Sequence, residues 1–555
     1  MYIGRDSDYR NSFDRDTCIG YIFRVYDKSP CMPLSDDQFL NFLADGYLVV
    51  TPSRMSDKDH DYLYASAQLL YERSEKLQSP TAHFEILGDN LRALIPEVDH
   101  VVNDPAVVDT LTSLIGDRYV LHPHHYVHTS TTADQGFHQD GNLPWNERGH
   151  YRSHRPDWLF LFYYPQAVDE TNGPTEIVAG SQYWTKDFET EDGWRSSDSM
   201  DRSFNGEDIR SDNFAYRDRR LQEGLDSVGV PDLDRRFIHV TKGSVVIGSY
   251  DLIHRGSRKL PDTPDRFMYK FYAARATEPN APAWHHKDMP DFAHVRKELQ
   301  PVVKQIWDWS SSQKSLVPVD DMQGVADRLM SGREDEKVEA AYRLGSDDAK
   351  EAIEILIKAV RSESESTRRA SGYGLRNQGQ RATLEIVEVL QASGRKTRRV
   401  AAYALGTVES ASSQLAVDAL IHCVESDGDD LVRSNAAYSL GQLSRASKCD
   451  AQRIGGALIA RLLPGVEPNN TVMAGFPRST LRQSVAYALM QLLINHELPD
   501  DITADVVRLA VDDPDRYVRG MLLEALSYCF SDDPVAAALT GGLIRQRWNI
   551  APRLT

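Results

Sequence analysis

The sequence predicts a multidomain α+β protein with a mostly β first half and an all-α second half. Fifteen of the 17 histidines lie at or before His294. The same half carries short aromatic and β-branched runs bounded by Gly, Pro and Asp, which are typical of strands. After about residue 312 a helical phrase recurs. We therefore expect an N-terminal segment 1–30, a β-rich domain 31–312 and a repeat domain 313–555.

Three runs in the first half are the clearest strand candidates. They are 158–164 (WLFLFYY), 243–248 (GSVVIG) and 266–272 (RFMYKFY). A long polar segment, 186–236, lies between the first two runs and is rich in Asp, Arg and Ser. Loops of this length are usually functional or disordered. We interpret this segment as a substrate lid, with a solvated flap as the alternative.

The repeated phrase of the second half contains a tyrosine. These tyrosines recur every 30 to 35 residues, with a wider interval before the last: Tyr342, Tyr373, Tyr403, Tyr438 and Tyr487. Each phrase is predicted to be the second helix of a hairpin, with Leu and Tyr filling a core that stacked hairpins share. The wider interval contains residues 463–478, whose Pro, Gly and Asn predict an inserted loop. The units resemble short HEAT repeats of phycobilisome-lyase-type arrays; the alternative is an ordinary helical bundle.

Composition excludes several classes of function. The formal net charge of −19 disfavours non-specific binding to nucleic acid or to an anionic membrane. No run approaches 18 uninterrupted apolar residues, and the first twenty residues contain no apolar core of a secretory signal. Five scattered cysteines without a CxxC motif fit a reducing compartment. We expect a cytoplasmic protein with neither a nucleic-acid nor a membrane partner.

A candidate metal site is selected by context. The pattern His-x-Asp/Glu occurs three times, at 83–85, 138–140 and 286–288, which is close to the number that chance predicts. Only His138-Gln-Asp140 follows a strand-like run and precedes a turn. His254 ends a further strand-like run, 114 residues after Asp140. Two histidines and one carboxylate form the facial ligand set of non-haem iron sites, so we predict these three residues as metal ligands.

A possible anchor for a co-substrate follows the last of these ligands. Arg266 comes twelve residues after His254 and begins the next predicted strand. A guanidinium facing the same cavity can bind a distal carboxylate through two parallel hydrogen bonds. Ser257, nine residues before Arg266, is predicted to add a hydroxyl donor.

Substrate contacts are less well defined by the sequence. Trp145 is a candidate because it closely follows the metal motif. His125 is a candidate because it belongs to a histidine-rich strand, with His122, His124 and His128, whose alternate residues can line a pocket. A polar strand face is the alternative for this strand.

Four motifs in order resemble the phytanoyl-CoA dioxygenase superfamily of Fe(II)/2-oxoglutarate oxygenases, across about residues 33–278. They are residues 34–50, His138-Gln-Asp140, residues 171–181 (TNGPTEIVAGS) and the series His254…Ser257…Arg266. The resemblance implies a double-stranded β-helix (jelly-roll, cupin-like) with flanking helices. It also implies Fe(II), 2-oxoglutarate and O₂ as cofactors, with His138, Asp140 and His254 as iron ligands and Arg266 as the co-substrate anchor.

The sequence departs from the family pattern at four points. Arg266 falls twelve residues after His254 rather than the usual eleven, and Ser257 falls three after it rather than two. Ala179 and Gln182 replace the usual Pro and His of the Pro-Gly-Ser-His phrase. These changes leave the metal motif intact, but they give no basis for transferring a substrate.

The resemblance implies oxidative decarboxylation of 2-oxoglutarate to succinate and CO₂, with a ferryl oxidant acting on a small-molecule or carrier-linked substrate. Because Asp140 fills the position that a halogenase leaves to halide, hydroxylation, desaturation or cyclisation is favoured. The alternatives are a catalytically idle barrel on a HEAT scaffold and a Mn or Zn hydrolase, in which Arg266 has no obvious role.

A row of basic residues opens the repeated helices. It consists of Arg368, Arg369, Arg398, Arg399, Arg433, Arg482 and Arg519. Because the start of a helix disfavours positive charge, this recurrence needs a reason. One is an internal ladder with acidic loop residues such as Glu365, Asp429, Asp430 or Asp515; the other is an acidic protein partner or a carrier-bound substrate.

Overall fold

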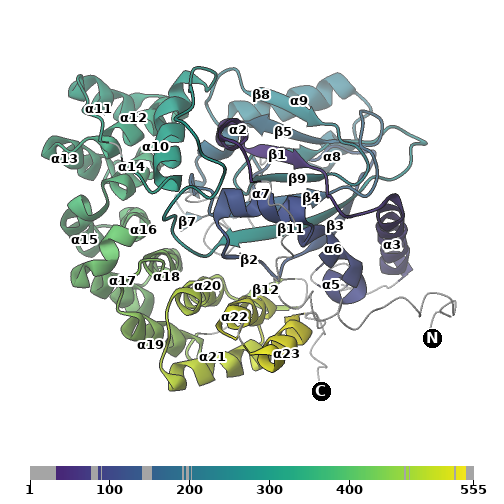
Figure 1. The fold of residues 1–555 in the computed structure, drawn as a ribbon. Coiled ribbons are helices and arrows are strands. Elements are labelled where there is room, and N and C mark those ends of the chain that lie inside the picture. The colour runs from purple at the N-terminus through teal and green to yellow at the C-terminus, as the bar shows by residue number, and fades with distance from the viewer. Residues whose placement is uncertain are drawn as a thin grey trace.

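The computed structural model describes residues 33–76, 86–88, 90–140, 153–190, 193–194, 199–201, 203–314, 316–467, 471–473, 476–530 and 533–544. The molecule is mixed α/β, with two antiparallel sheets in the first half and helices in the second (Figure 1). No helix within these ranges is long and apolar enough to cross a membrane. We refer to residues 33–312 as the β-rich half and to residues 313–544 as the helical half.

The larger sheet contains the three strands that the sequence predicts most clearly. Its order is β1-β9-β4-β11-β2, with β3 also pairing with β11. The bounds are β1 (Tyr47–Val50), β2 (Tyr119–Leu121), β3 (Tyr126–Thr129), β4 (Trp158–Tyr163), β9 (Val245–Ser249) and β11 (Phe267–Arg275). Strands β4, β9 and β11 are buried along their whole length, because both faces of the sheet are covered.

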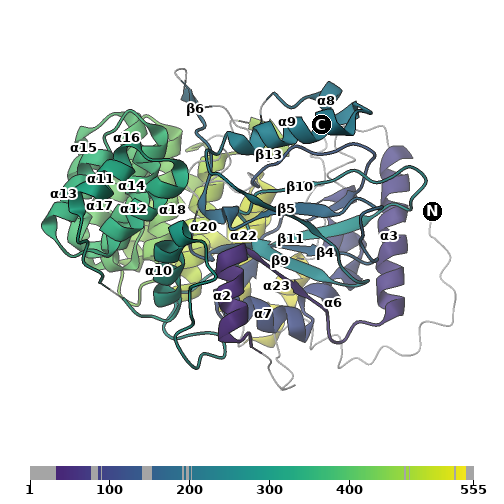
Figure 2. The same ribbon diagram turned by 90° about the horizontal axis from the view of Figure 1, so that it is seen from above.

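The smaller sheet packs against the inner face of the larger one (Figure 2). Its order is β10-β5-β8, with bounds β5 (Thr175–Ala179), β8 (Asp234–Ile238) and β10 (His254–Gly256). The rings of Phe160 and Phe162, on β4, lie 5.4 Å and 5.5 Å from the ring of His254, on β10. Helices α3 (Asp57–Lys76) and α7 (Pro105–Ile115) pack on the larger sheet. The Tyr269 hydroxyl, on β11, donates to the Leu63 carbonyl oxygen of α3 at 2.5 Å.

The motif at residues 34–50 forms α2 (Asp36–Asp45) followed by β1. Ser35 and Gln38 close a capping box at the start of the helix. Gly46 ends the helix with φ 87°, a conformation that favours glycine. A Cβ at Gly46 would also lie 2.5 Å from the Gln182 Oε1 atom.

The polar segment 186–236 is not a simple loop. It contains β6 (Glu189–Thr190), β7 (Gly193–Trp194), α8 (Gly206–Arg210) and α9 (Phe214–Asp226), and it ends in β8 of the smaller sheet. Arg217, on α9, donates to the Thr132 carbonyl oxygen at 3.2 Å and lies 3.8 Å from Asp134. The segment is therefore built into the β-rich half, and its role as a substrate lid stays a prediction.

The helical half is a two-layered array. Its helices are α11 (Met322–Ser331), α12 (Glu334–Ser346), α13 (Lys350–Ala359), α14 (Glu365–Gln378), α15 (Thr383–Ala392), α16 (Arg395–Ala404), α17 (Gln414–Ser426), α18 (Asp430–Leu443), α19 (Ala451–Leu462), α20 (Thr480–Asn495), α21 (Asp500–Asp512), α22 (Arg516–Cys529) and α23 (Pro534–Ile544). The even-numbered helices from α12 to α22 form an inner layer and the odd-numbered helices from α11 to α21 an outer one (Figure 1). Every repeated phrase lies on an inner helix. In the predicted loop at 463–478, the described residues include a hairpin of β12 (Thr471–Met473) and β13 (Phe476–Arg478).

The inner layer curves around the β-rich half (Figure 1). Two of the repeated tyrosines contact that half. The Tyr342 hydroxyl lies 3.0 Å from His154 Nδ1, and the Tyr487 ring lies 5.6 Å from that of Trp158. We expected the tyrosines to fill the core of the array itself, whereas these two form an interface between the halves. Tyrosine suits this position because its ring packs on apolar atoms while its hydroxyl reaches polar partners.

A buried ion pair joins the two halves. Arg445 Nη1 lies 2.6 Å from Asp157 Oδ1, and both side chains are 0% exposed. Arg445 Nη2 also donates to the Arg275 carbonyl oxygen at 2.9 Å. At the other end of the array, helix α10 (Gln300–Ser310) packs against both α2 and α12. The residues on the two sides of the predicted boundary near residue 312 are therefore in extensive contact.

Candidate metal centre and adjoining pocket

The two predicted histidine ligands are held side by side by the backbone. His138 and His254 exchange both backbone hydrogen bonds, at 3.0 Å and 2.9 Å, in an antiparallel bridge at the start of β10. Opposite residues of such a pair project to the same face of the sheet. The two imidazole rings are 4.5 Å apart as a result.

His138, Asp140 and His254 form a group that can hold a metal ion. One ligand atom from each residue lies within 4.8 Å of the others. His138 Nδ1 lies 3.1 Å from the Gly136 carbonyl oxygen, and His254 Nδ1 lies 2.9 Å from the Leu252 carbonyl oxygen. Because a carbonyl oxygen only accepts, each Nδ1 carries the proton and each Nε2 keeps its lone pair for a metal.

Asp140 is buried and held by two partners on β11. Its Oδ1 atom lies 2.9 Å from Lys270 Nζ, and its Oδ2 atom accepts from the Tyr272 hydroxyl at 2.9 Å. Burial by itself raises the pKa of Asp140, but the Lys270 ammonium and the two histidines outweigh burial and hold the pKa below its usual range. The carboxylate is therefore charged, as a metal ligand must be.

His254 is a neutral imidazole at physiological pH. Burial, together with the neighbouring His138, lowers the pKa of His254 to about 3. A neutral imidazole is the form of histidine that binds a metal. The donor set of two imidazole nitrogens and one carboxylate suits a divalent metal such as Fe(II).

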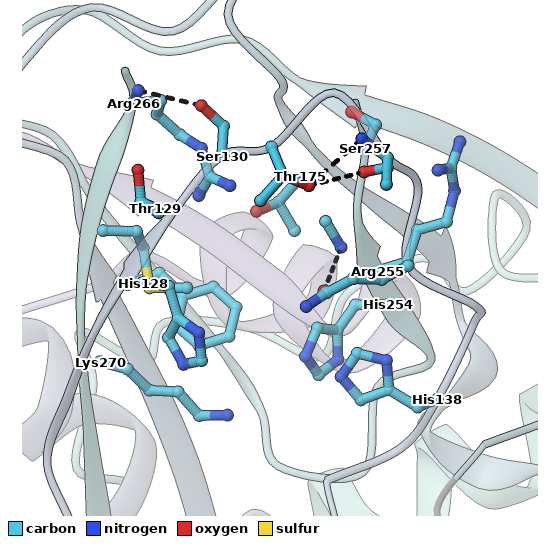
Figure 3. Close-up of a pocket in the computed structure, with 16 residues that line it drawn as sticks. His128, Thr129, Ser130, His138, Thr175, His254, Arg255, Ser257, Arg266 and Lys270 are labelled. Atoms are coloured by element: carbon cyan, nitrogen blue, oxygen red, sulfur yellow. Dashed lines mark hydrogen bonds between the residues drawn. The ribbon is translucent and has the colours of Figure 1, made fainter. Parts of the chain in front are cut away.

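A pocket extends from the histidines to Arg266 (Figure 3). In the figure the two imidazoles lie at one end, Arg266 lies at the other, and Lys270 points into the space beside the histidines. The lining residues are mostly polar: His128, Thr129, Ser130, Thr131, Ala133, Gln135, His138, Phe162, Thr175, His254, Arg255, Gly256, Ser257, Arg266, Met268 and Lys270.

Arg266 is a buried cation with unused donors. Its side chain is 3% exposed, and within the described part of the chain its Nε and Nη1 atoms have no hydrogen-bond partner. Burial lowers the pKa of Arg266, and no carboxylate among the described residues forms an ion pair with its side chain. Arg255 differs, because it is paired with both Asp134 at 2.6 Å and Glu176 at 2.5 Å. A buried cation without an anion is costly, so the Arg266 end of the pocket fits a carboxylate ligand.

Two predicted contacts take different positions from those expected. The Ser257 hydroxyl donates its proton to the Pro174 carbonyl oxygen, so it is not a free donor toward the pocket as we had expected. His125 is not among the lining residues of the described pocket; its ring packs 5.3 Å from that of Phe271. His128, three residues later, lines the pocket instead, because it lies opposite Met268 in the pairing of β3 with β11.

The other predictions at this site have different outcomes. Trp145 lies outside the described residues, as does the His-x-Glu motif at 83–85. The motif at 286–288 is used elsewhere, since His286 Nδ1 lies 2.8 Å from Asp36 Oδ1 at the start of α2. His138, Asp140, His254 and Arg266 meet in one region of the molecule, and their roles as ligands and anchor stay predictions.

Sequence reasoning missed Lys270 and Tyr272 as partners of Asp140. One signal could have found them. In a strand, alternate side chains lie on the same face. If Arg266 faces the pocket, the side chains of Met268, Lys270 and Tyr272 are therefore expected on the same face. The structure confirms this alternation, because Tyr269 of the same strand faces α3.

No model of a protein family and no curated protein matches the sequence. Solved structures similar to the chain include the non-heme alpha-ketoglutarate-dependent carbocyclase SnoK from nogalamycin biosynthesis, which is 15% identical, with coverage of 44% of this chain and 85% of that chain and a TM-score of 0.30. EctD from S. alaskensis with 2-oxoglutarate and 5-hydroxyectoine is 15% identical, with coverage of 48% and 86% and a TM-score of 0.30. EvdMO1 is 14% identical, with coverage of 43% and 49% and a TM-score of 0.30. Because these sequence identities and TM-scores are low, the function proposed below rests on the residues of the site.

Proposed function

We propose that this chain is an Fe(II)- and 2-oxoglutarate-dependent dioxygenase of the phytanoyl-CoA dioxygenase type. Its β-rich half is then a double-stranded β-helix and its helical half a HEAT-like array. The proposed reaction is hydroxylation, desaturation or cyclisation of a small-molecule or carrier-linked substrate, with release of succinate and CO₂.

One observation carries the proposal. The same pocket has a His-Asp-His group at one end and, at the other, the buried guanidinium of Arg266, which forms no ion pair with any described residue. The metal-binding end suits the 2-oxo acid end of 2-oxoglutarate, and Arg266 suits its distal carboxylate. This pair of features favours an oxygenase over a Mn or Zn hydrolase, for which a buried guanidinium beside the metal has no use.

Each residue of the site has a role that its contacts support. His138 and His254 would hold iron through Nε2, since their Nδ1 atoms are occupied by backbone carbonyls. Asp140 would be the third ligand, oriented by Lys270 and Tyr272. Phe162 lies beside the His254 ring and keeps that side of the site dry. Bound iron supplies the activation of oxygen, while the protein supplies geometry and a buried site.

The main alternative is a catalytically idle barrel carried by an interaction scaffold. It is disfavoured because the candidate ligand atoms are grouped as a metal ion requires, and because Arg266 has donors that no described residue uses. A recruiting role for the helical half is compatible with catalysis, but the concave face of the array already holds the β-rich half. An outside protein or carrier would therefore meet the outer layer.

The test is turnover of 2-oxoglutarate with a metabolite extract. The anaerobically Fe(II)-loaded protein is mixed with 2-oxoglutarate and extract and then exposed to O₂, and succinate is measured. We expect oxygen-dependent succinate in the wild type and none in His254→Ala. Equal succinate in both proteins, after subtraction of a protein-free control, would exclude this function.

A further inference from the structure

Lys270 forms an ion pair with a predicted metal ligand inside the pocket. Its Nζ atom lies 2.9 Å from Asp140 Oδ1, and its side chain is 7% exposed. Within the described residues Asp140 is the one anion in ion-pair contact with Lys270. The ammonium also lies 5.7 Å from the ring centroid of Phe162 and 5.1 Å from that of Tyr272. The charge of Lys270 is thus balanced by the same carboxylate that a metal would use.

Arg266, immediately before β11, and Lys270, on β11, line the same pocket. They are four positions apart in the sequence, which corresponds to about 13 Å between their Cα atoms along a strand. Both side chains point into the pocket in Figure 3, Arg266 at the far end and Lys270 beside the histidines. The pocket therefore presents two cations to a ligand that extends along it, and two carboxylates on one short chain match them.

A divalent cation at Asp140 changes the balance of charge around Lys270. The metal takes part of the negative charge that Lys270 now uses and adds positive charge within a few ångströms. Like charges at short range repel each other more strongly inside a protein than in water. A carboxylate that reaches Lys270 removes this repulsion, because it supplies the missing anion.

We propose that Lys270 couples the binding of the metal to the binding of a dicarboxylate. The proposal rests on the proposed function. It adds Lys270 to the residues of the site, and it adds that the metal and the dicarboxylate strengthen each other's binding. Without a dicarboxylate Lys270 opposes the metal; with one, its ammonium and the Arg266 guanidinium pair with the two carboxylates. A metal that binds without the co-substrate is therefore held weakly. The site then rarely contains a metal that can react with oxygen while no 2-oxoglutarate is bound to supply electrons.

The coupling is a ratio of affinities and is measured without turnover. Mn(II), which is stable in air, replaces Fe(II), and free Mn(II) is followed by electron paramagnetic resonance. Its dissociation constant is determined alone, with 2-oxoglutarate and with glutarate. Glutarate has the two carboxylates but lacks the 2-oxo oxygen, so it reports the contribution of charge without chelation by the 2-oxo acid.

Two substitutions separate charge from hydrogen bonding. Lys270→Met removes the charge and keeps an unbranched chain, and Lys270→Gln keeps a hydrogen-bond donor for Asp140 without the charge. In both we expect Mn(II) alone to bind at least about tenfold more tightly than in the wild type. We also expect the tightening by glutarate, present in the wild type, to be lost. The control is Lys242→Met, which removes a lysine paired with Asp61 at 2.7 Å outside the pocket.

The outcomes distinguish this proposal from the proposed function. If the wild type binds neither Mn(II) nor 2-oxoglutarate, the proposed function fails, and the coupling fails with it. If the wild type binds both but Lys270→Met shows the same coupling ratio, the coupling alone is wrong. If Lys270→Gln behaves as the wild type while Lys270→Met does not, Lys270 is a positioning hydrogen-bond donor, and coupling by charge is also overturned.

Discussion

Two buried arginines close to the candidate metal centre differ in what balances their charge. Arg255 lies between Asp134 and Glu176 and is satisfied by the protein itself. Arg266 has donors that no group in the described residues accepts from. Charges buried in proteins are normally paired, and exceptions gather at binding sites. The difference favours a structural role for Arg255 and agrees with the proposed ligand-binding role of Arg266.

Replacing Arg266 by Met should weaken the binding of 2-oxoglutarate by about 2–5 kcal/mol, because its distal carboxylate would be buried without a partner. The affinity for Mn(II) alone should change little. Calorimetric titration of the Mn(II)-loaded protein measures the first quantity. Arg258→Met is the matched control, since Arg258 is paired with Asp134 beside the pocket. Normal binding of 2-oxoglutarate to Arg266→Met would show that another residue binds its distal carboxylate.

At the residue scale the sequence predicts which side chains meet, but not all of their partners. His138 can be found because it follows a strand-like run and precedes a turn, and His254 because it ends a strand-like run; such positions are where side chains converge on a site. The Asp140–Lys270 pair cannot be found in this way, because it depends on how the loop after His138 packs against β11. The engagement of Ser257 by Pro174 depends in the same way on the path of a turn.

Among the elements, the inner helices show how the array is held together. The basic row at their starts is paired with acidic residues, largely across neighbouring repeats. Arg399 forms two hydrogen bonds to Asp429, and Arg398 forms two to Asp427. Arg482 is paired with Asp513 in the same manner. This arrangement favours the internal ladder over an exposed row that awaits an acidic partner.

The ladder predicts a graded loss of stability. Arg399 is buried, whereas the Arg398 side chain is 24% exposed. Removal of a buried partner leaves Asp429 unpaired, so Arg399→Ala should cost about 3–5 kcal/mol. Arg398→Ala should cost about 1 kcal/mol or less, as exposed pairs do. Urea unfolding measures both, and equal small losses would show that the row is solvated surface.

The elements themselves follow largely from the local sequence. Residues 158–164, 243–248 and 266–272 are runs rich in aromatic and β-branched residues, and they become the central strands β4, β9 and β11. The segment 186–236 was not foreseen as α8, α9 and β8, because its apolar residues are few. Its helices are stabilised by caps such as Asn205 and Asn213 and by packing on the β-rich half.

In the whole molecule, the helical half surrounds part of the β-rich half rather than presenting an open concave surface (Figure 1). The contact includes the fully buried pair Arg445–Asp157 at the start of β4. Strand β4 also carries Phe160 and Phe162, which pack on His254. The array thus contacts the strand whose side chains pack against the candidate metal ligand His254. The sequence does not reveal this contact, since nothing in a repeat pattern says what its concave face covers.

Breaking the buried pair should destabilise the whole molecule. Arg445→Met leaves the Asp157 charge buried without a partner, at a cost of about 3–5 kcal/mol. The double variant with Asp157→Asn removes both charges and should recover much of this loss. The midpoint of urea unfolding and the number of transitions measure the effect. If Arg445→Met unfolds like the wild type, the two halves are not held together by this pair.

The interface should also make stability depend on pH. His154 packs between Tyr342 and Tyr373, and burial, reinforced by Arg369, lowers its pKa from 6.5 to about 3. Since the unfolded chain takes up the proton first, this contribution is complete above pH 6.5 and is lost as the pH falls toward 3. One such group lowers the free energy of unfolding by about 1.4 kcal/mol per pH unit.

The comparison of slopes isolates His154 from the other acid-sensitive groups. The free energy of unfolding is measured between pH 7 and pH 5 for the wild type and for His154→Gln, which does not titrate. We expect a shallower slope for the variant. His422→Gln, on the exposed side of an outer helix, is the control and should keep the wild-type slope. A steeper slope in His154→Gln would contradict the assignment.

The central claim is that His138, Asp140 and His254 hold Fe(II) together with 2-oxoglutarate. The most direct measurement is the visible spectrum of the protein titrated with Fe(II) and 2-oxoglutarate in the absence of oxygen. A co-substrate bound to iron through its 2-oxo and carboxylate oxygens gives a weak charge-transfer band. We predict this band in the wild type and its absence in His138→Ala and His254→Ala. A band that is unchanged in both variants would contradict the assignment of the metal ligands.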